Sequence, residues 1–417
     1  MRFLYSFAIY SYWFAIFLVS PFDKKAALWI KGRKNWKQKL KILCSKKKNI
    51  ACFHCASFGE FEQAKPVIEK FKSKFPQATI LVSFYSPSGF EYKKNDPIAD
   101  IVIYLPIDST KNAKQFIEIV KPTVFFFIKY EFWYNFMHQL KKNNVPFYYI
   151  SAIFRPSQPF FQIWGKWFIN NLQQASCFFV QDKKSSELLQ SIGIENVEII
   201  GDTRFDRVLT IANQNQQFEF VNKFKKDKKL IVAGSTWIPD EMVLKSFLTH
   251  FSNEYQLIIA PHLIDKEHIN KILVLFKNFD TLCYTSMDFQ TIEHVQVLIL
   301  DSMGMLNKIY QYGEIAYIGG AFKTGLHNTI EAAVYGIPIF FGPHYHKFNE
   351  AEALVTSGGA FSIHSAHTMI EKVEMFENNP LFYQESCCLC KQYVQANLGA
   401  ANKLLAYDIQ FKQYEVE

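Results

Sequence analysis

The chain has 417 residues, of which 49% are hydrophobic, enough for two or three domains with buried cores. Its formal net charge is +8, but residues 1–48 hold twelve Lys and Arg against a single acidic residue, Asp23, and the remainder has slightly more acidic than basic residues. This distribution excludes a nucleic-acid-binding body, because the basic groups of such a body would cover its folded surface.

Residues 1–22 are expected to form a membrane anchor. Residues 3–22 carry no charged side chain, and as a helix they would be about 30 Å long, enough to cross a bilayer core. A helix lying in the interface is the alternative, since Ser and Tyr residues interrupt the apolar run. A cleaved signal peptide is disfavoured because the basic residues follow the apolar run. The basic connector at residues 23–48 would hold the body against anionic headgroups on the cytoplasmic side.

Residues 49–208 alternate apolar strands with helices, which predicts an N-terminal Rossmann-like domain with a parallel, doubly wound sheet. Strands are expected at residues 50–55, 79–84, 101–104, 124–128, 147–151, 177–181 and 197–200. Helices are expected at residues 62–75, 109–120, 133–142, 161–174 and 184–192, after a connector helix at 36–43. Residues 209–229 are polar and lack strand character, and we interpret them as an interdomain linker.

A second alternation of the same kind occupies residues 230–395 and predicts a second Rossmann-like domain. Its strands are expected at residues 230–233, 256–260, 281–284, 297–300, 315–318 and 337–341. Two such α/β domains facing each other across a cleft make the GT-B architecture, in which ligands bind at the carboxyl edges of both sheets. The terminal residues 396–417 are expected to be helical and able to cross back to the first domain.

Two acidic residues of the first domain follow predicted strands. Ser57 and Gly59 are expected to form a loop on the acceptor side, and Glu60 follows them where a helix begins, so its carboxylate can take a proton from an acceptor hydroxyl in the cleft. The alternative is that Glu60 only stabilises the positive end of its helix, and spacing alone favours this reading. Glu131 follows the strand at 124–128 and is expected to face the same cleft.

One strand–helix–strand unit of the second domain combines features of a phosphate site and a sugar site. Gly319 and Gly320 lie between strand and helix and would leave backbone N–H groups free for a phosphate, although a tight turn that binds nothing also explains two glycines. His327 and Asn328 then form a polar entry to the helix, where the Glu331 carboxylate can accept hydrogen bonds from ribose hydroxyls.

Two other loops of the second domain contain candidate ligands. Gly234 and Ser235 form a second turn suited to a phosphate, or they cap the next helix. His262 follows the strand at 256–260 and can contact a base or a phosphate, although a lone His is more often a surface group. The eight cysteines show no zinc-ligand spacing, so we expect reduced thiols and no metal site.

Nine motifs run along the chain in a fixed order. They are SFGEFEQAKP (57–66), SPSGFE (86–91), YLPIDS (104–109), KPTVFFFIKYEFWYN (121–135), GDTRFDRV (201–208), AGSTWIPDE (233–241), DSMGML (301–306), IGGAFKTGLHNTIEAAVYGIPIFFGPH (318–344) and FNEAEAL (348–354). Together they resemble the Kdo (3-deoxy-D-manno-octulosonic acid) transferases of lipid A biosynthesis. Members of that family are GT-B enzymes of the inner membrane that move Kdo from CMP-Kdo to a lipid A precursor.

The resemblance implies an inverting, single-displacement transfer without a cofactor, with Glu60 as general base and Glu131 as a supporting acid. It assigns the binding of CMP-Kdo to the matching residues Gly234, Ser235, Gly319, Gly320, His327, Asn328, Glu331 and Asn349. Where the family usually has Pro-Arg-His this chain has Pro261-His262-Leu263, so His262 or Lys266 would replace a cationic donor contact. A sugar-nucleotide epimerase, another GT-B transferase and a non-catalytic membrane-associated protein remain as alternatives.

Overall fold

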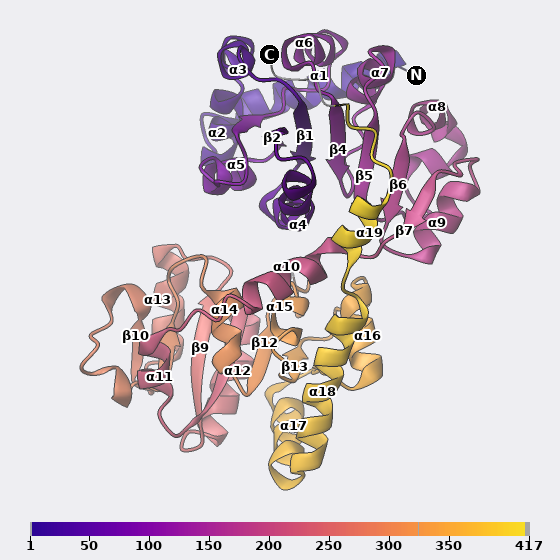
Figure 1. The fold of residues 1–417 in the computed structure, drawn as a ribbon. Helices are drawn as coiled ribbons and strands as arrows, with labels where there is room; N and C mark the ends of the chain where they lie inside the picture. The colour runs from indigo at the N-terminus through magenta and orange to yellow at the C-terminus, as the bar shows by residue number, and fades with distance from the viewer. Residues whose placement is uncertain (1, 324, 413–417) are drawn as a thin grey trace. The chain divides into compact units, whose positions relative to one another are not determined.

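The computed structural model describes residues 2–323 and 325–412, and the chain divides into two compact units (Figure 1). Unit 1 comprises the chain up to Arg207 together with the chain from Leu398 onward, and unit 2 comprises Val208–Asn397. Each unit contains one sheet of seven parallel strands with helices packed on it. The predicted α/β class with two doubly wound parallel sheets is therefore confirmed, whereas the cleft of the GT-B architecture stays a prediction.

The sheet of unit 1 has the strand order β3-β2-β1-β4-β5-β6-β7. Both β1 and β4 are buried along their whole length, as strands covered on two faces must be. The strands are β1 (Ile50–Cys55), β2 (Thr79–Phe84), β3 (Ile101–Tyr104), β4 (Val124–Ile128), β5 (Phe147–Ala152), β6 (Cys177–Val180) and β7 (Val197–Ile199).

Successive residues of the central strand β1 enter two different cores. Cys52 packs in the cluster that Leu40, Phe116 and Phe136 complete, while Phe53 belongs to the cluster on the opposite face. The helices of unit 1 are α1 (Arg2–Val19), α2 (Lys24–Gly32), α3 (Trp36–Cys44), α4 (Phe58–Lys74), α5 (Pro87–Lys93), α6 (Thr110–Val120), α7 (Tyr134–Lys142), α8 (Ile169–Leu172), α9 (Lys183–Gln190), α10 (Thr203–Ala212, which runs on into unit 2) and α19 (Ala400–Ala406).

The helix predicted at residues 161–174 is confirmed only in part, because only Ile169–Leu172 are α-helical. The segment forms the two 3₁₀ helices η1 (Pro159–Phe161) and η2 (Ile163–Phe168), followed by the single turn of α8. Gly165 lies so close to the preceding turn that an added Cβ would be 1.8 Å from the carbonyl oxygen of Pro159. The aromatic side chains Phe160 and Phe168 are buried in the core, so tertiary packing overrides the helical pattern here.

The residues interpreted as a linker, 209–229, contain structure of their own. They begin within α10 and include α11 (Glu219–Lys225), which buries Phe220, Val221 and Phe224. The chain from Leu398 onward belongs to unit 1, where α19 packs on α4. The Asp206 carboxylate fixes the start of α19 by accepting hydrogen bonds from the backbone N–H groups of Gly399 (2.7 Å) and Ala401 (2.8 Å).

The sheet of unit 2 has the strand order β10-β11-β9-β8-β12-β13-β14. Its strands are β8 (Lys229–Thr236), β9 (Tyr255–Pro261), β10 (Thr281–Cys283), β11 (Val297–Ile299), β12 (Ile315–Ile318), β13 (Ile339–Phe341) and β14 (Ala360–Ser362). Its other helices are α12 (Ile238–His250), α13 (Lys266–Leu275), α14 (Leu306–Ile309), α15 (Ile330–Ala333), α16 (Asn349–Ser357), α17 (Ala366–Asn378) and α18 (Pro380–Ala396), with short 3₁₀ helices η3 (Tyr284–Ser286), η4 (Ile292–His294) and η5 (Tyr310–Tyr312). The edge strand β14 was not predicted.

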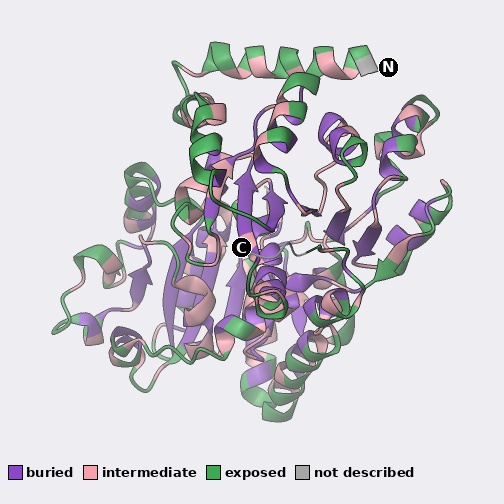
Figure 2. Ribbon diagram, turned by 45° about the horizontal axis from the view of Figure 1, so that its top comes forward, coloured by how far each residue is buried: buried purple, intermediate pink, exposed green. Residues whose placement is uncertain are grey.

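The N-terminal helix α1 is largely exposed (Figure 2). Tyr5 packs against Tyr134 and Trp167 of unit 1, whereas Phe7 and Phe14 are more than half exposed. No helix within the described part of the chain is both long and apolar enough to cross a membrane. The structure thus contains the predicted helix, and its role as an anchor stays a prediction.

Candidate active site

The two predicted acids of unit 1 come to the same edge of its sheet. Strand β1 pairs with β2 on one side and with β4 on the other, so the strand order reverses between β1 and β4. Glu60 follows β1 and Glu131 follows β4. Ligands of doubly wound sheets bind at the carboxyl ends of strands at this reversal point. The topology therefore places both acids where a ligand is expected.

Glu60 is a buried carboxyl group in the first turn of α4. Its carboxylate turns back and accepts a hydrogen bond from the backbone N–H of Ala56, in the loop that precedes the helix. Burial, followed by the negative charge of Glu131, raises the pKa of Glu60 to about 8, against the effect of hydrogen bonds from Ala56 and Ser57 and of the charge on Lys129. A carboxyl group with a pKa near neutrality can exchange a proton with a substrate.

Glu131 is held by two side chains that were not predicted as site residues. The Trp133 Nε1–H donates to its Oε2 at 2.7 Å, and His54 Nε2 lies 3.1 Å from the same oxygen. A His within the otherwise apolar strand β1 was the available signal in the sequence. Throughout residues 2–323 and 325–412 there is no group of three or more His, Cys, Asp or Glu side chains able to hold a metal ion, and this cluster is no exception.

The loop predicted on the acceptor side lies beside Glu60. Ser57 precedes α4 in extended conformation without a side-chain cap hydrogen bond. Gly59 is exposed, and a Cβ added there would meet nothing within 4 Å. The backbone at Gly59 is thus open to a molecule approaching Glu60.

The N-terminal helix reaches the segment that follows Glu131. Buried Asp108 caps α7 by accepting hydrogen bonds from the N–H groups of Asn135 (2.9 Å) and Phe136 (3.0 Å), and it also accepts a hydrogen bond from the Tyr5 hydroxyl (2.6 Å). Because Trp133 immediately precedes α7, this network links α1 to the side chain that holds Glu131.

In unit 2 the strand order reverses between β8 and β12, where Gly234 and Gly319 lie. The expectation of free N–H groups at the glycine pair is wrong, because Gly319 donates to the carbonyl of Gly234 (2.9 Å) and Gly320 donates to Asp240 Oδ2 (3.0 Å). A Cβ on Gly319 would lie 2.4 Å from the carbonyl oxygen of Ser235. The glycines therefore serve the close packing of two loops.

Three aromatic rings stack at this edge of unit 2. The His262 ring lies 4.8 Å from the Trp237 ring and 4.6 Å from the His327 ring, with interplanar angles below 30°. Burial and the neighbouring His262 lower the pKa of His327 to about 4, so its ring is neutral at physiological pH. Its Nε2 is buried without a hydrogen-bond partner among the residues described, which leaves a polar group for a ligand.

The remaining residues predicted to bind the donor substrate lie near the starts of α15 and α16. Asn328 bonds Glu331 through Nδ2 (2.8 Å) and accepts from the N–H of Ile330 (3.3 Å) ahead of the four-residue α15. Asn349 is exposed at the start of α16. The amide of Asn328 thus orients the Glu331 carboxylate.

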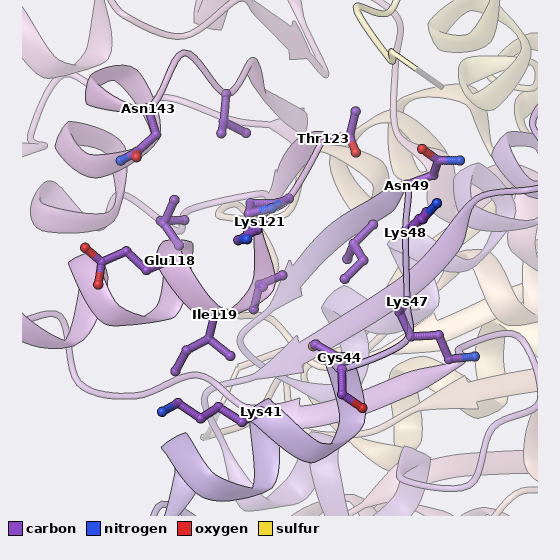
Figure 3. Close-up of a pocket in the computed structure, with 16 residues that line it drawn as sticks. Lys41, Cys44, Lys47, Lys48, Asn49, Glu118, Ile119, Lys121, Thr123 and Asn143 are labelled. Atoms are coloured by element: carbon purple, nitrogen blue, oxygen red, sulfur yellow. The ribbon is translucent and has the colours of Figure 1, made fainter. Parts of the chain in front are cut away.

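A cavity of about 1030 Å³ opens at the other edge of the sheet of unit 1 (Figure 3). It is lined by Lys41 and Lys121 and by Asn49 and Thr123, which directly precede β1 and β4. Since the acids follow these strands, the cavity lies at the opposite end of the sheet. Its lysines lie where α3 and α6 end, and they complement the negative ends of these helices.

The sequence is similar to known Kdo transferases. A profile of the family described as "3-Deoxy-D-manno-octulosonic-acid transferase (kdotransferase)" matches residues 34–207, which lie in unit 1. The 3-deoxy-D-manno-octulosonic acid transferase of Haemophilus influenzae is 28% identical over 84% of this chain and 84% of its own length. That of Aquifex aeolicus is 27% identical over 77% of this chain and 84% of its own. A bifunctional glycosyltransferase/methyltransferase of Fusobacterium nucleatum is 25% identical, and the match spans 52% of its length.

Solved structures of similar fold include nucleotide-sugar enzymes. A putative UDP-N-acetylglucosamine 2-epimerase from Listeria monocytogenes has a TM-score of 0.61 at 11% identity, covering 88% of this chain and 100% of that one. The UDP-GlcNAc 2-epimerase from Neisseria meningitidis has a TM-score of 0.60 at 14% identity, covering 86% and 98%. At these identities the likeness concerns the fold alone.

Proposed function

Since the chain belongs to the family of Kdo transferases and is a glycosyltransferase, we propose that it transfers Kdo from CMP-Kdo to a lipid A precursor in lipopolysaccharide biosynthesis. The acid pair carries this proposal. Glu60 and Glu131 lie within the matched residues, at the reversal point of the sheet, and the pKa of Glu60 is raised to about 8.

The proposed reaction is a single displacement. Ionised Glu60 takes the proton of an acceptor hydroxyl, the hydroxyl oxygen forms a bond to the anomeric carbon of Kdo, and the bond from that carbon to the phosphate oxygen of CMP breaks. The departing oxygen keeps the electron pair of the broken bond, and the configuration at the anomeric carbon inverts.

Unit 2 supplies the proposed contacts to the donor. Within the described part of the chain, the Nε2 of the neutral His327 ring has no hydrogen-bond partner, and the ring lies against His262, where the family usually has an arginine. A ring nitrogen of this kind can donate a hydrogen bond to a phosphate oxygen. Glu331, oriented by Asn328, is suited to accept hydrogen bonds from the ribose hydroxyls of CMP.

The location that we propose is the cytoplasmic face of the inner membrane. The exposed Phe7 and Phe14 of α1 give an apolar surface, and the basic Lys24 and Lys25 follow it. Apolar insertion combined with attraction to anionic headgroups would hold the enzyme beside its lipid-linked acceptor.

The decisive experiment incubates the purified protein with CMP-Kdo and a tetraacylated lipid A precursor and weighs the lipid product by mass spectrometry. We expect the mass of the acceptor plus Kdo. Glu60→Gln should lower turnover by about 10²–10⁴-fold, because the base is lost, yet retain thermal stabilisation by CMP-Kdo. Glu69→Gln, on the same helix, is the matched control and should retain native turnover. An unchanged lipid mass with the native protein contradicts the proposal.

A further inference from the structure

His54 is a fully buried polar side chain at the centre of the sheet of unit 1. It lies on β1, between β2 and β4, where both faces of the sheet are covered. Burying an imidazole there is costly unless both ring nitrogens have hydrogen-bond partners. The identity of these partners indicates what the ring does.

Of the two neutral tautomers of His54, the one with the proton on Nε2 agrees with the shorter contacts. Nδ1 lies nearer to Ser83 Oγ (2.9 Å) than to the Ser83 carbonyl oxygen (3.2 Å), and Trp133 Nε1 lies nearer to Glu131 Oε2 (2.7 Å) than to His54 Nε2 (3.1 Å). The Nε2 of His54 lies 3.1 Å from the same Glu131 Oε2. With the proton on Nε2, the ring accepts a hydrogen bond from the Ser83 hydroxyl and donates one to the Glu131 carboxylate. Because the Trp133 Nε1–H donates to the same oxygen, two side-chain donors converge on one carboxylate.

We propose that His54 is a positioning residue of the transfer site: its Nε2–H, oriented by Ser83, holds the Glu131 carboxylate in place. The inference deepens the proposed function and rests on it for its kinetic test alone. The hydrogen bonds themselves are features of the folded protein.

The two acids of the pair have different hydrogen-bond partners. Glu131 Oε2 has two side-chain donors, whereas Glu60 is bonded by the backbone of the loop before it and its pKa is raised, first by burial and then by the charge of Glu131. Because its pKa is about 8, Glu60 holds a proton near neutral pH. The other titratable groups whose charges act on the pair are Cys55, Tyr85, Lys129 and Tyr149.

A consequence concerns the strength of the base. The fixed charge of Glu131 opposes ionisation of Glu60, so Glu60 binds a proton more tightly and is a stronger base once it is ionised. Without the His54 donor, the Glu131 carboxylate can turn away from Glu60. Less negative charge then faces Glu60, which ionises at lower pH and becomes a weaker base.

The kinetic test compares two substitutions of His54. In His54→Phe the ring stays but the donor is lost, and we expect the acidic limb of the kcat profile to move down by about one pH unit and maximal turnover to fall about tenfold, with KM for CMP-Kdo unchanged. His54→Gln restores an N–H donor and should keep the native limb. Trp133→Phe removes the other donor to the same oxygen, and it carries the test if His54→Phe does not fold.

A second test does not depend on activity. The pKa of Glu60 is about 8 in the folded protein and 4.5 in its ordinary state, so the folded state holds a proton that the unfolded chain has lost, and the free energy of unfolding falls as pH rises from 4.5 to 8. Glu60→Gln should abolish this fall. The fall is measured by comparing the free energy of unfolding of the native protein with that of Glu60→Gln at pH 5 and at pH 8. The same comparison is made between His54→Phe and the double variant His54→Phe/Glu60→Gln. Here the fall in unfolding free energy that Glu60 causes should be smaller, by the amount that corresponds to a shift of about one pH unit in the pKa of Glu60.

The outcomes separate the two proposals. The role of His54 would be overturned if His54→Phe and Trp133→Phe both kept the pH dependence of unfolding free energy and the acidic limb of the native protein. That result would leave the transferase assignment intact. A diminished fall in His54→Phe that His54→Gln restores, in a protein that transfers no Kdo, would support the role of His54 and overturn the proposed function.

Discussion

At the scale of single residues, two glycines of the candidate site differ in whether the fold requires a glycine at their position. Gly320 has a φ of +95° and an added Cβ would lie 2.3 Å from the carbonyl oxygen of Gly325, whereas a Cβ at Gly59 would meet nothing within 4 Å. The first glycine is required by the fold of unit 2. The second is not required by the fold of unit 1, and its predicted place on the acceptor side can be tested.

Alanine substitutions test this difference. Gly320→Ala should lower the free energy of unfolding by about 1–3 kcal/mol, because it combines backbone strain with a steric clash. Gly59→Ala should leave stability within about 0.5 kcal/mol of the native value and lower the rate of transfer to the lipid acceptor. Chemical denaturation and the mass-spectrometric assay measure the two effects. Native transfer by Gly59→Ala would remove Gly59 from the acceptor side.

The pKa of His327 gives a pH prediction. The pKa is lowered from 6.5 to about 4, first by burial and then by the charge of His262, so the unfolded chain binds a proton between these values that the folded protein does not. The free energy of unfolding should therefore fall as pH drops from 6.5 to 4. His327→Phe should flatten this dependence, measured by denaturation at pH 4.5 and 6.5, and the exposed His367→Phe should not. An equal slope in native protein and His327→Phe would contradict the assignment.

At the scale of elements, apolar runs of the sequence predicted strands well. The bounds of β1, β2, β3, β4 and β12 agree with the prediction at both ends, because the strands of a parallel sheet covered on both faces are mostly apolar along their length. The edge strand β14 has three residues and its last two are only partly buried, so its pattern is too short to detect. At residues 161–174 the apolar spacing was helical, but aromatic packing around Gly165 formed 3₁₀ turns instead.

The candidate site was predictable in its acids but not in its contacts. Topology follows from the order of strands and helices, so Glu60 and Glu131 could be placed at one edge. The partner of the Gly320 N–H is Asp240, 80 positions away in the chain, and no local pattern announces such a bond. The contact of His54 with Glu131 is equally distant in sequence and depends on the pairing of β1 with β4.

The cap of α7 allows a prediction at this scale. Asp108→Ala removes the acceptor for two N–H groups of α7 and leaves the Tyr5 hydroxyl unpaired, so the start of α7 and the preceding Trp133 should loosen. We expect faster hydrogen exchange at the start of α7 and a turnover lowered about tenfold or more. Asp182→Ala, which removes the cap of α9, is the matched control, with a cost of about 1 kcal/mol and native turnover. Native turnover of Asp108→Ala would show that the cap does not support Glu131.

At the scale of the whole molecule, the N-terminal basic region does not form one surface. Tyr12 of α1 packs on Trp29 of α2, which packs on Tyr85 beyond the end of β2, so α1 and α2 lie at the carboxyl edge of the sheet of unit 1. Lys47 and Lys48 precede β1 and line the cavity at the amino edge. The basic connector therefore spans the sheet from one edge to the other, and only its first part accompanies the apolar face of α1.

This separation determines which edge should meet a membrane. Each exposed Phe of α1 that enters a bilayer contributes about 1.5–3 kcal/mol, whereas a lysine near anionic lipid contributes about 1 kcal/mol and only within a Debye length of the surface. In a sedimentation assay with vesicles of phosphatidylglycerol and phosphatidylcholine, Phe7→Ser/Phe14→Ser should weaken binding by about a hundredfold. Lys47→Ala/Lys48→Ala, at the opposite edge, should change it less than twofold and leave turnover unaltered. Stronger loss from the lysine pair than from the phenylalanine pair would mean that the amino edge faces the bilayer, with Glu60 and Glu131 at the end of the sheet remote from the lipid acceptor.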